Sequence, residues 1–142
     1  MRHIAHVSLV VHDYDEAIDF YTQKLGFDLI EDTRLSDEKR WVLVMPKGSA
    51  CSLLLAKAAT NEQRAVVGSQ TGGRVFLFLY TDDFWTDYTS LLKKGVSFVR
   101  PLMEHSYGLV AVFTDLYGNL WDLLQPANGS IGVESREVFD LC

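Results

Sequence analysis

Long apolar runs and basic residues are both scarce in this sequence of 142 residues. No apolar run approaches the roughly 20 residues that a membrane-spanning helix needs, and the N-terminus has no apolar stretch followed by a small-residue cleavage site. We therefore expect a cytoplasmic protein that neither crosses a membrane nor is secreted. Thirteen Lys and Arg stand against 19 Asp and Glu, for a formal net charge of −6. That balance argues against nucleic acid as a partner, because phosphate binding needs clustered cations.

Cysteines and the common catalytic motifs are also missing or rare. The two cysteines, Cys51 and Cys142, form no CxxC pattern, and we expect both to be free thiols in a reducing compartment. The sequence shows no Gly-rich phosphate loop, no Ser/His/Asp arrangement and no context for a nucleophilic cysteine.

The stretch from Ile4 to Ile30 is the most regular part of the chain. A β-rich run, Ile4 to Val11, is followed by Asp13, which can cap a helix. Apolar residues then recur at helical spacing until Gly26, which ends the helix. Along the first strand, alternation puts His6 on the face opposite to the apolar face that meets the helix. This stretch predicts a strand, a helix and a second strand.

The stretch from Val75 to Phe98 repeats this design. Gly26 and Gly95 are 69 residues apart, and an aspartate precedes each helix. We predict a second helix over Phe84 to Lys94, with Trp85, Tyr88, Leu91 and Leu92 facing inward. Such a repeat indicates two copies of one unit, each burying its apolar face.

These elements predict an α+β fold in which two βαβββ modules form a cupped mixed sheet with helices on the outside. A single domain covers residues 1–126, with module one at 1–57, a connector at 58–73 and module two at 74–126. Thr60 and Gln63 fit a capping box for a short helix in the connector. In module two we expect a strand over Val96 to Arg100, then a loop from Pro101 to Tyr107. The extension, 127–142, begins with a linker and ends in a segment that is either a docked helix or frayed.

Three stretches resemble the vicinal oxygen chelate superfamily, which includes glyoxalase I, extradiol dioxygenases and bleomycin-resistance proteins. They are HVSLVVHDYDEAIDFYTQKLGFDL, GGRVFLFLYTDDF and YGLVAVFTDLYGNLWDLLQP. The resemblance covers roughly residues 1 to 126. It implies that the ligand binds in a cup between modules, and that modules pair within a chain or across a homodimer. Because this scaffold hosts many chemistries, it identifies a fold more than a reaction.

Metal-dependent members of that superfamily place ligands on the first and last strands of each module. The first position falls on His6 and the last on Asp122, where the superfamily usually has Glu. The other two fall on Leu53 and Val75, which cannot bind a metal ion. The resemblance therefore implies a divalent metal on His6 and Asp122, but this set falls short of the three protein ligands such ions usually need. The same two residues are candidates for acid/base catalysis without metal, and a histidine buried for structural reasons is the alternative for His6.

Aromatic side chains in or beside the predicted strands are mostly core residues by default, and a few should line a ligand pocket. Our candidates for substrate contact are Trp41, Phe76 and Tyr107, together with His105 in the loop before Tyr107.

Two functions remain open at this point. One is an enzyme that binds a small molecule and acts as a lyase or isomerase through an enolate, with His6 and Asp122 as acid/base or metal residues. The other is a metal-free, non-catalytic protein of the resistance type that sequesters an apolar or aromatic compound. A dioxygenase is disfavoured, because only one histidine and one carboxylate align. A structural dimer without a ligand is a third possibility.

Overall fold

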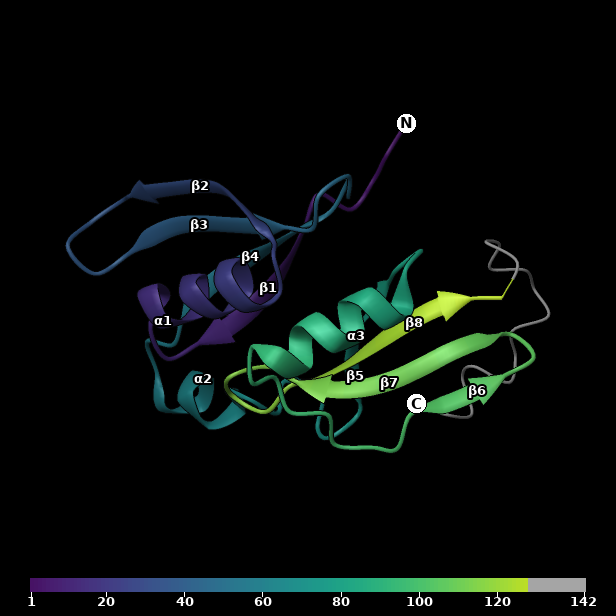
Figure 1. The fold of residues 1–142 in the computed structure, drawn as a ribbon. Coiled ribbons are helices and arrows are strands. Elements are labelled where there is room, and N and C mark those ends of the chain that lie inside the picture. The colour runs from purple at the N-terminus through teal and green to yellow at the C-terminus, as the bar shows by residue number, and fades with distance from the viewer. Residues whose placement is uncertain (128–142) are drawn as a thin grey trace. The chain divides into compact units, whose positions relative to one another are not determined.

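Two compact units make up the computed structural model, which describes residues 1–127 (Figure 1). The first unit runs from Met1 to Gln70 and the second begins at Thr71. Each unit holds its own four-stranded mixed sheet with helices. The predicted α+β class with a repeated module is confirmed. Most of the predicted C-terminal extension, including its linker and its docked or frayed end, lies outside the described residues.

The first unit has four strands in the order β1-β4-β3-β2, of which β1 and β4 are parallel and the other neighbours antiparallel. Its elements are β1 (His6–Val11), α1 (Tyr14–Asp19), the π-helical turn η1 (Phe20–Lys24), β2 (Asp28–Arg34), β3 (Arg40–Met45), β4 (Ser52–Lys57) and α2 (Asn61–Val66).

The second unit repeats this topology, with strands in the order β5-β8-β7-β6 and a parallel pair formed by β5 and β8. Its elements are β5 (Val75–Tyr80), α3 (Phe84–Lys93), β6 (Met103–His105), β7 (Gly108–Thr114) and β8 (Leu120–Pro126). None of the helices in residues 1–127 is long and apolar enough to span a membrane.

Local capping explains where the helices begin and end. The Asp13 carboxylate accepts the Glu16 N–H at the start of α1, and the Asp83 carboxylate accepts the Thr86 N–H at the start of α3. Gly26 follows η1 and Gly95 follows α3, with φ of 73° and 82°, a left-handed conformation that glycine adopts without steric cost. The predicted cap of α2 is also confirmed, since Thr60 Oγ1 accepts the Gln63 N–H at 3.1 Å.

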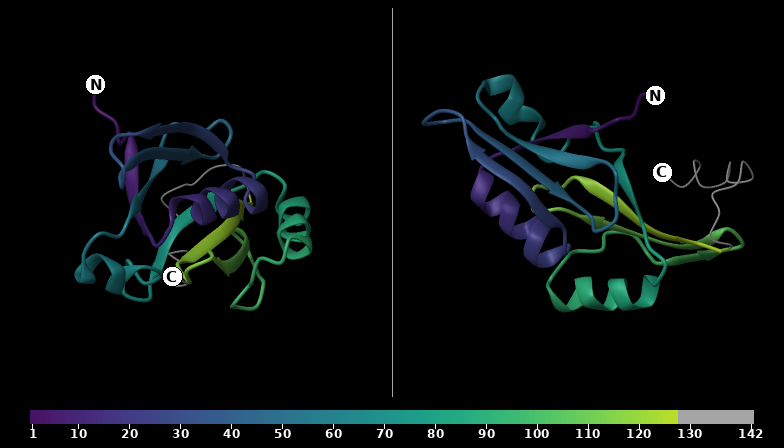
Figure 2. Two further views of the ribbon diagram at one scale, coloured as in Figure 1. Left: turned by 90° about the vertical axis from the view of Figure 1, so that its left-hand side faces the viewer. Right: turned by 90° about the horizontal axis from the view of Figure 1, so that it is seen from above.

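Helices α1 and α3 each pack against one face of their own sheet (Figure 2), whereas α2 has no buried residue. In β1 the side chains of Leu9 and Val11 are fully buried while Ser8 is exposed, which is the alternation expected from the sequence. Cys51 is a free thiol, as predicted, and Cys142 lies outside the described residues.

The predicted strand over Val96 to Arg100 was wrong. Only Phe98 bridges to Phe113 there, and the regular strand is β6, inside the segment expected to be a loop. Pro101 explains the interruption, because it has no N–H to donate to a ladder. Pairing resumes at Met103, opposite Val110.

The inward face of α3 also differs from the prediction. Phe84 and Leu91 are buried, whereas Trp85 and Leu92 are about half exposed. Residues 84, 88 and 91 follow a spacing of four and three along one helix face, and Trp85 is rotated away from that face by one residue. The sequence pattern identified the helix correctly, and Leu91 and Tyr88 lie on its inner face as predicted, but Phe84 takes the place expected for Trp85.

Gly108 begins β7 at a point where two strands approach closely. Its φ is 148°, and a Cβ there would lie 2.0 Å from the Gln125 carbonyl oxygen of the paired strand β8. We predict that Gly108→Ala lowers the free energy of unfolding by about 2 kcal/mol or more, through strain and this backbone clash. Urea denaturation of both proteins measures the difference.

Gly95→Ala is the matched control, because Gly95 also has a positive φ but a Cβ there would meet nothing within 4 Å. It should cost only about 1 kcal/mol. Equal losses in the two variants would contradict the steric explanation.

Candidate functional site

His6 lies on the face of the first sheet that α1 does not cover. It stands opposite Ser52 in the parallel β1–β4 ladder, and its Nδ1 lies 2.6 Å from Ser52 Oγ. The Trp41 ring approaches the imidazole edge to face, with centroids 5.9 Å apart. His6 is exposed while Ser52 is buried. The hydrogen bond therefore holds one ring nitrogen and leaves the rest of the imidazole open to a ligand.

Asp122 lies in the middle of β8 and is only 1% exposed. It is paired with Phe78 of β5 and with Val112 of β7, so its carboxylate lies between two apolar neighbours of the ladder. Burying a carboxylate in such a strand is costly unless its charge is compensated. His6 and Asp122 belong to different units, the first on β1 and the second on β8.

The donor set does not fit a metal centre of three protein ligands. The ladder shows that Leu53 is opposite Val7, so the β4 residues that share the His6 face are Ser52, Leu54 and Ala56. None of these is an acid or a histidine, and Val75 offers no donor in the second unit. Across residues 1–127 no group of three His, Cys, Asp or Glu side chains is placed to hold a metal ion.

The other sequence-predicted contacts lie at two edges of the second sheet. The rings of His105 and Tyr107 stack with centroids 4.6 Å apart at the β6–β7 turn, and His105 Nε2 is buried without a hydrogen-bond partner in the described part of the chain. Phe76 lies on β5, at the opposite edge of this sheet, where its ring contacts that of Trp121. These three candidates therefore do not form one cluster.

A pocket of about 530 Å³ lies in the first unit, at the end of its sheet near the β2–β3 loop and α2. Trp41 is the one sequence-predicted contact that lines it. The pocket is lined by Val10, Tyr14, Ser36, Glu38, Lys39, Arg40, Trp41, Leu54, Leu55, Ala56, Lys57, Ala59 and Gln63.

The pocket exists because two neighbouring strands separate. Strands β3 and β4 pair only at Leu43–Leu54 and Val44–Leu53. By this register the ladder would continue with Trp41 opposite Ala56 and Arg40 opposite Lys57. These four residues line the pocket instead. In the second unit the corresponding strands β7 and β8 pair at all seven positions, from Gly108–Pro126 to Thr114–Leu120. The two units thus repeat one topology but differ at this ladder.

Arg40 holds the wall of the pocket together. Its guanidinium donates through Nε and Nη2 to the two oxygens of Asp32 on β2, at 3.0 and 2.6 Å, and through Nη1 to Asp15 on α1, at 2.9 Å. It also lies over the Tyr14 ring, 5.1 Å from its centroid. The hydrogen bonds from Arg40 lower the pKa of the Asp32 carboxyl below its ordinary value of 3.8. The same hydrogen bonds, which the Asp32 and Asp15 carboxylates accept, raise the pKa of the Arg40 guanidinium.

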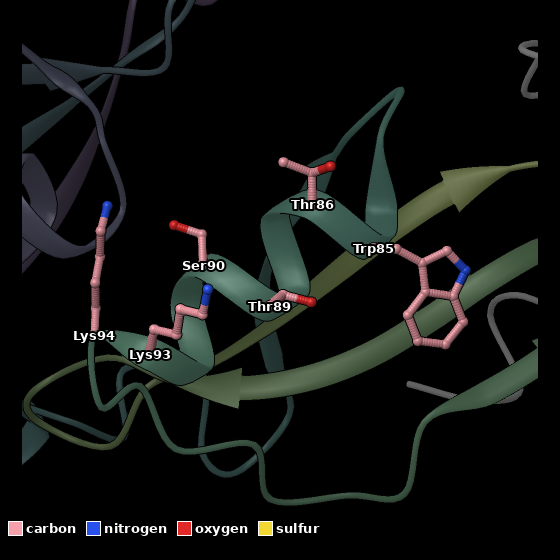
Figure 3. A pocket seen from close by; sticks show the side chains of 6 residues that line it. All are labelled: Trp85, Thr86, Thr89, Ser90, Lys93 and Lys94. Atoms are coloured by element: carbon pink, nitrogen blue, oxygen red, sulfur yellow. The ribbon is translucent and has the colours of Figure 1, made fainter.

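A second hollow, of about 560 Å³, lies along the exposed side of α3. Its lining comes from this helix and its last turn alone, and Figure 3 shows Trp85 pointing away from Lys93 and Lys94 at the other end. One convex helix supplies no opposing wall, so this surface is a weaker site than the pocket of the first unit.

Comparisons with known proteins agree with this architecture. The family model described as the Glyoxalase/Bleomycin resistance protein/Dioxygenase superfamily matches residues 3–123. The chain belongs to this superfamily, and the resemblance seen in the sequence is confirmed. A relative that is 64% identical over 124 residues is an uncharacterized protein of Shewanella frigidimarina; the match covers 86% of this chain and 92% of the relative.

Two solved structures from Streptomyces sp. CB03234 are each 34% identical to the chain. One is TnmS3, described as an antibiotic binding protein, with a TM-score of 0.74 over 89% of this chain and 98% of TnmS3. The other is described as a glyoxalase/bleomycin resistance protein, with a TM-score of 0.70 over 87% of this chain and 100% of its own. The solved structures similar to this chain therefore include one that is described as an antibiotic binding protein.

The Arg40–Asp32 contact predicts how stability depends on pH. Because the pKa of Asp32 is lower in the folded protein than in the unfolded chain, the contact stabilises the fold above the unfolded pKa, about 3.9. That contribution is lost as the pH falls through the folded pKa. Asp32→Asn should thus lower the free energy of unfolding by about 0.5 kcal/mol at pH 6, a small value because the pair is partly exposed.

Urea unfolding of wild type and variant between pH 6 and pH 2 measures this difference, which should shrink toward the acid end. Asp28→Asn, on the same exposed strand, is the control and should show no such pH-dependent difference. A difference that stays constant down to pH 2 would rule out the charge-based explanation.

Proposed function

We propose that this protein binds a planar organic molecule in the pocket of the first unit and does not transform it. The observation that carries the proposal is the pocket at the β3–β4 separation. Its volume of about 530 Å³ lies within the roughly 300–1,000 Å³ typical of small-molecule sites.

The lining of the pocket suits a flat, partly apolar ligand. Trp41 is half-buried and offers an aromatic ring, while Val10, Leu54 and Ala56 add apolar surface. Lys39 and Lys57 stand at the same pocket, and neither is in an ion pair in the described residues. A ligand with an aromatic body and an acidic group would match both features.

The relatives support a binding role. TnmS3 is described as an antibiotic binding protein. It is 34% identical to this chain, and the match covers 89% of this chain and 98% of TnmS3. The absence of a three-ligand donor set in residues 1–127 is compatible with binding that needs no metal. A ligand position between the two modules, expected from the family, stays a prediction.

An enzyme is the second candidate, favoured by His6. Its imidazole is held at Nδ1 by Ser52 and is otherwise exposed, an arrangement that would allow it to take a proton in a lyase or isomerase reaction through an enolate. Asp122 would be the acid in that scheme. Metal analysis after loading with Ni, Zn, Mn or Fe tests this candidate: stoichiometric metal that is lost in His6→Ala would favour the enzyme over the binding protein.

The homodimer and the cytoplasmic location inferred from the sequence remain part of this proposal. The edge strand β2 supports a dimer, since it is exposed along its whole length and carries the apolar side chains of Leu29 and Ile30. Sedimentation equilibrium would measure the mass in solution.

Binding of fluorene-2-carboxylate, a planar aromatic acid, tests the proposed function. We expect a saturable 1:1 isotherm by titration calorimetry that is unchanged by EDTA, with the compound recovered intact by chromatography. Trp41→Ala should weaken binding by about tenfold, because it removes a stacking surface and apolar contact area.

Trp85→Ala is the matched control, since Trp85 is exposed on α3 and does not line this pocket. Its affinity should equal that of wild type. Three outcomes would each overturn the proposal of a non-catalytic binder in this pocket. They are equal weakening of binding in both variants, no saturable binding to wild type, and conversion of the compound to a product.

A further inference from the structure

Tyr14 is a buried polar residue that lines the pocket and that neither the sequence pattern nor the family assigns to a site. It is the first residue of α1, directly after the cap Asp13, and is only 7% exposed. Its hydroxyl accepts the backbone N–H of Arg40 at 3.1 Å. Its ring lies under the Arg40 guanidinium. Both contacts fix the position of the hydroxyl at the pocket wall.

The Arg40 N–H would belong to the β3–β4 ladder if that ladder continued. The Leu35 N–H bonds to the Lys39 carbonyl, so odd-numbered residues of β3 direct their backbone groups toward β2 and even-numbered ones toward β4. The Arg40 N–H therefore points to the side of β4, where Lys57 would be its partner by register. The Tyr14 hydroxyl accepts this N–H in place of β4.

The second unit supplies an internal comparison. Asp83 caps α3 just as Asp13 caps α1, so Phe84 is the counterpart of Tyr14. Phe84 is fully buried and has no hydroxyl, and the β7–β8 ladder beside it is complete. The aromatic ring is thus common to both units. The hydroxyl is found only where the ladder opens and a pocket forms.

The hydroxyl has hydrogen-bonding capacity that the protein does not use. A tyrosine hydroxyl carries one hydrogen and two acceptor lone pairs. In residues 1–127 its one hydrogen bond is the N–H it accepts from Arg40, which leaves its own hydrogen available. A buried donor without a partner is costly, so the pocket gains most from a ligand that offers an acceptor there.

We propose that the Tyr14 hydroxyl is a specificity-determining donor that selects ligands carrying a carbonyl or similar acceptor oxygen on a planar ring system. This inference rests on the proposed function, because it assumes that a small molecule occupies the pocket. The apolar lining and Trp41 hold the ring system, and Tyr14 discriminates between ligands of the same shape.

Two probes of nearly the same shape test it: 9-fluorenone-2-carboxylate, which has a ring carbonyl, and fluorene-2-carboxylate, which has a methylene at that position. Their dissociation constants are measured by titration calorimetry on wild type, Tyr14→Phe and Tyr88→Phe. Wild type should bind the ketone roughly fivefold more tightly, the value of about one hydrogen bond. Tyr14→Phe should abolish that preference while it still binds fluorene-2-carboxylate.

Tyr88→Phe removes a hydroxyl from α3, which does not line this pocket, and should keep the preference of wild type. A preference that survives in Tyr14→Phe, or that is absent from wild type, overturns the role of Tyr14 while leaving the proposed function intact. Equal loss of affinity for both probes in Tyr14→Phe would make Tyr14 a structural residue only and would also overturn it. If wild type binds neither probe, the proposed function and this inference both fail.

Discussion

The hydrogen bond from the Arg40 N–H to the Tyr14 hydroxyl is the contact on which the site of the first unit depends. A backbone N–H at the edge of a ladder needs a partner, and a strand normally supplies it. In this unit a helix residue supplies it, so the Arg40 N–H keeps a partner where β3 leaves β4. The guanidinium of the same residue ties β2 and α1 to this point through Asp32 and Asp15. Through its N–H and its guanidinium, Arg40 therefore joins β3 to α1 and β2 at the pocket wall.

The repeat shows how one topology produces two different surfaces. Both units begin with a strand, a capped helix and a glycine with positive φ, and both pair their first and last strands in parallel. In the second unit the ladder is complete and Phe84 packs as an ordinary core ring. The first unit keeps the same ring position but adds a hydroxyl. A small chemical difference at a helix start thus accompanies a pocket in one copy and a continuous sheet in the other.

Part of the candidate site could be predicted from the sequence. Alternation along β1 placed His6 away from the helix, and Trp41 was a candidate as an aromatic residue in or beside a predicted strand. The partner of His6, Ser52, was not predicted, since it depends on the register of strands 46 residues apart in the chain. The register also shows that Leu53 lies on the sheet face opposite to that of His6. The residue pattern within β4 alone could not reveal this. Tyr14 was missed because a tyrosine at the start of an amphipathic helix has the same pattern as any core aromatic residue. Comparison with Phe84 in the second repeat was the available signal.

The sequence by itself determined the number of modules, their order of elements and the superfamily. These follow from short-range rules, namely hydrophobic periodicity, capping aspartates and helix-ending glycines, which act over a few residues. Only the tertiary structure decided the strand at β6, the buried stripe of α3 and the opening between β3 and β4. Each of these depends on which residue elsewhere in the fold supplies a hydrogen bond or a packing surface. Pro101 has no N–H to donate to a ladder, whereas the Tyr14 hydroxyl accepts the Arg40 N–H. Such partners are set by register and by the approach of helices to sheets, and neither is encoded in a local window of the chain.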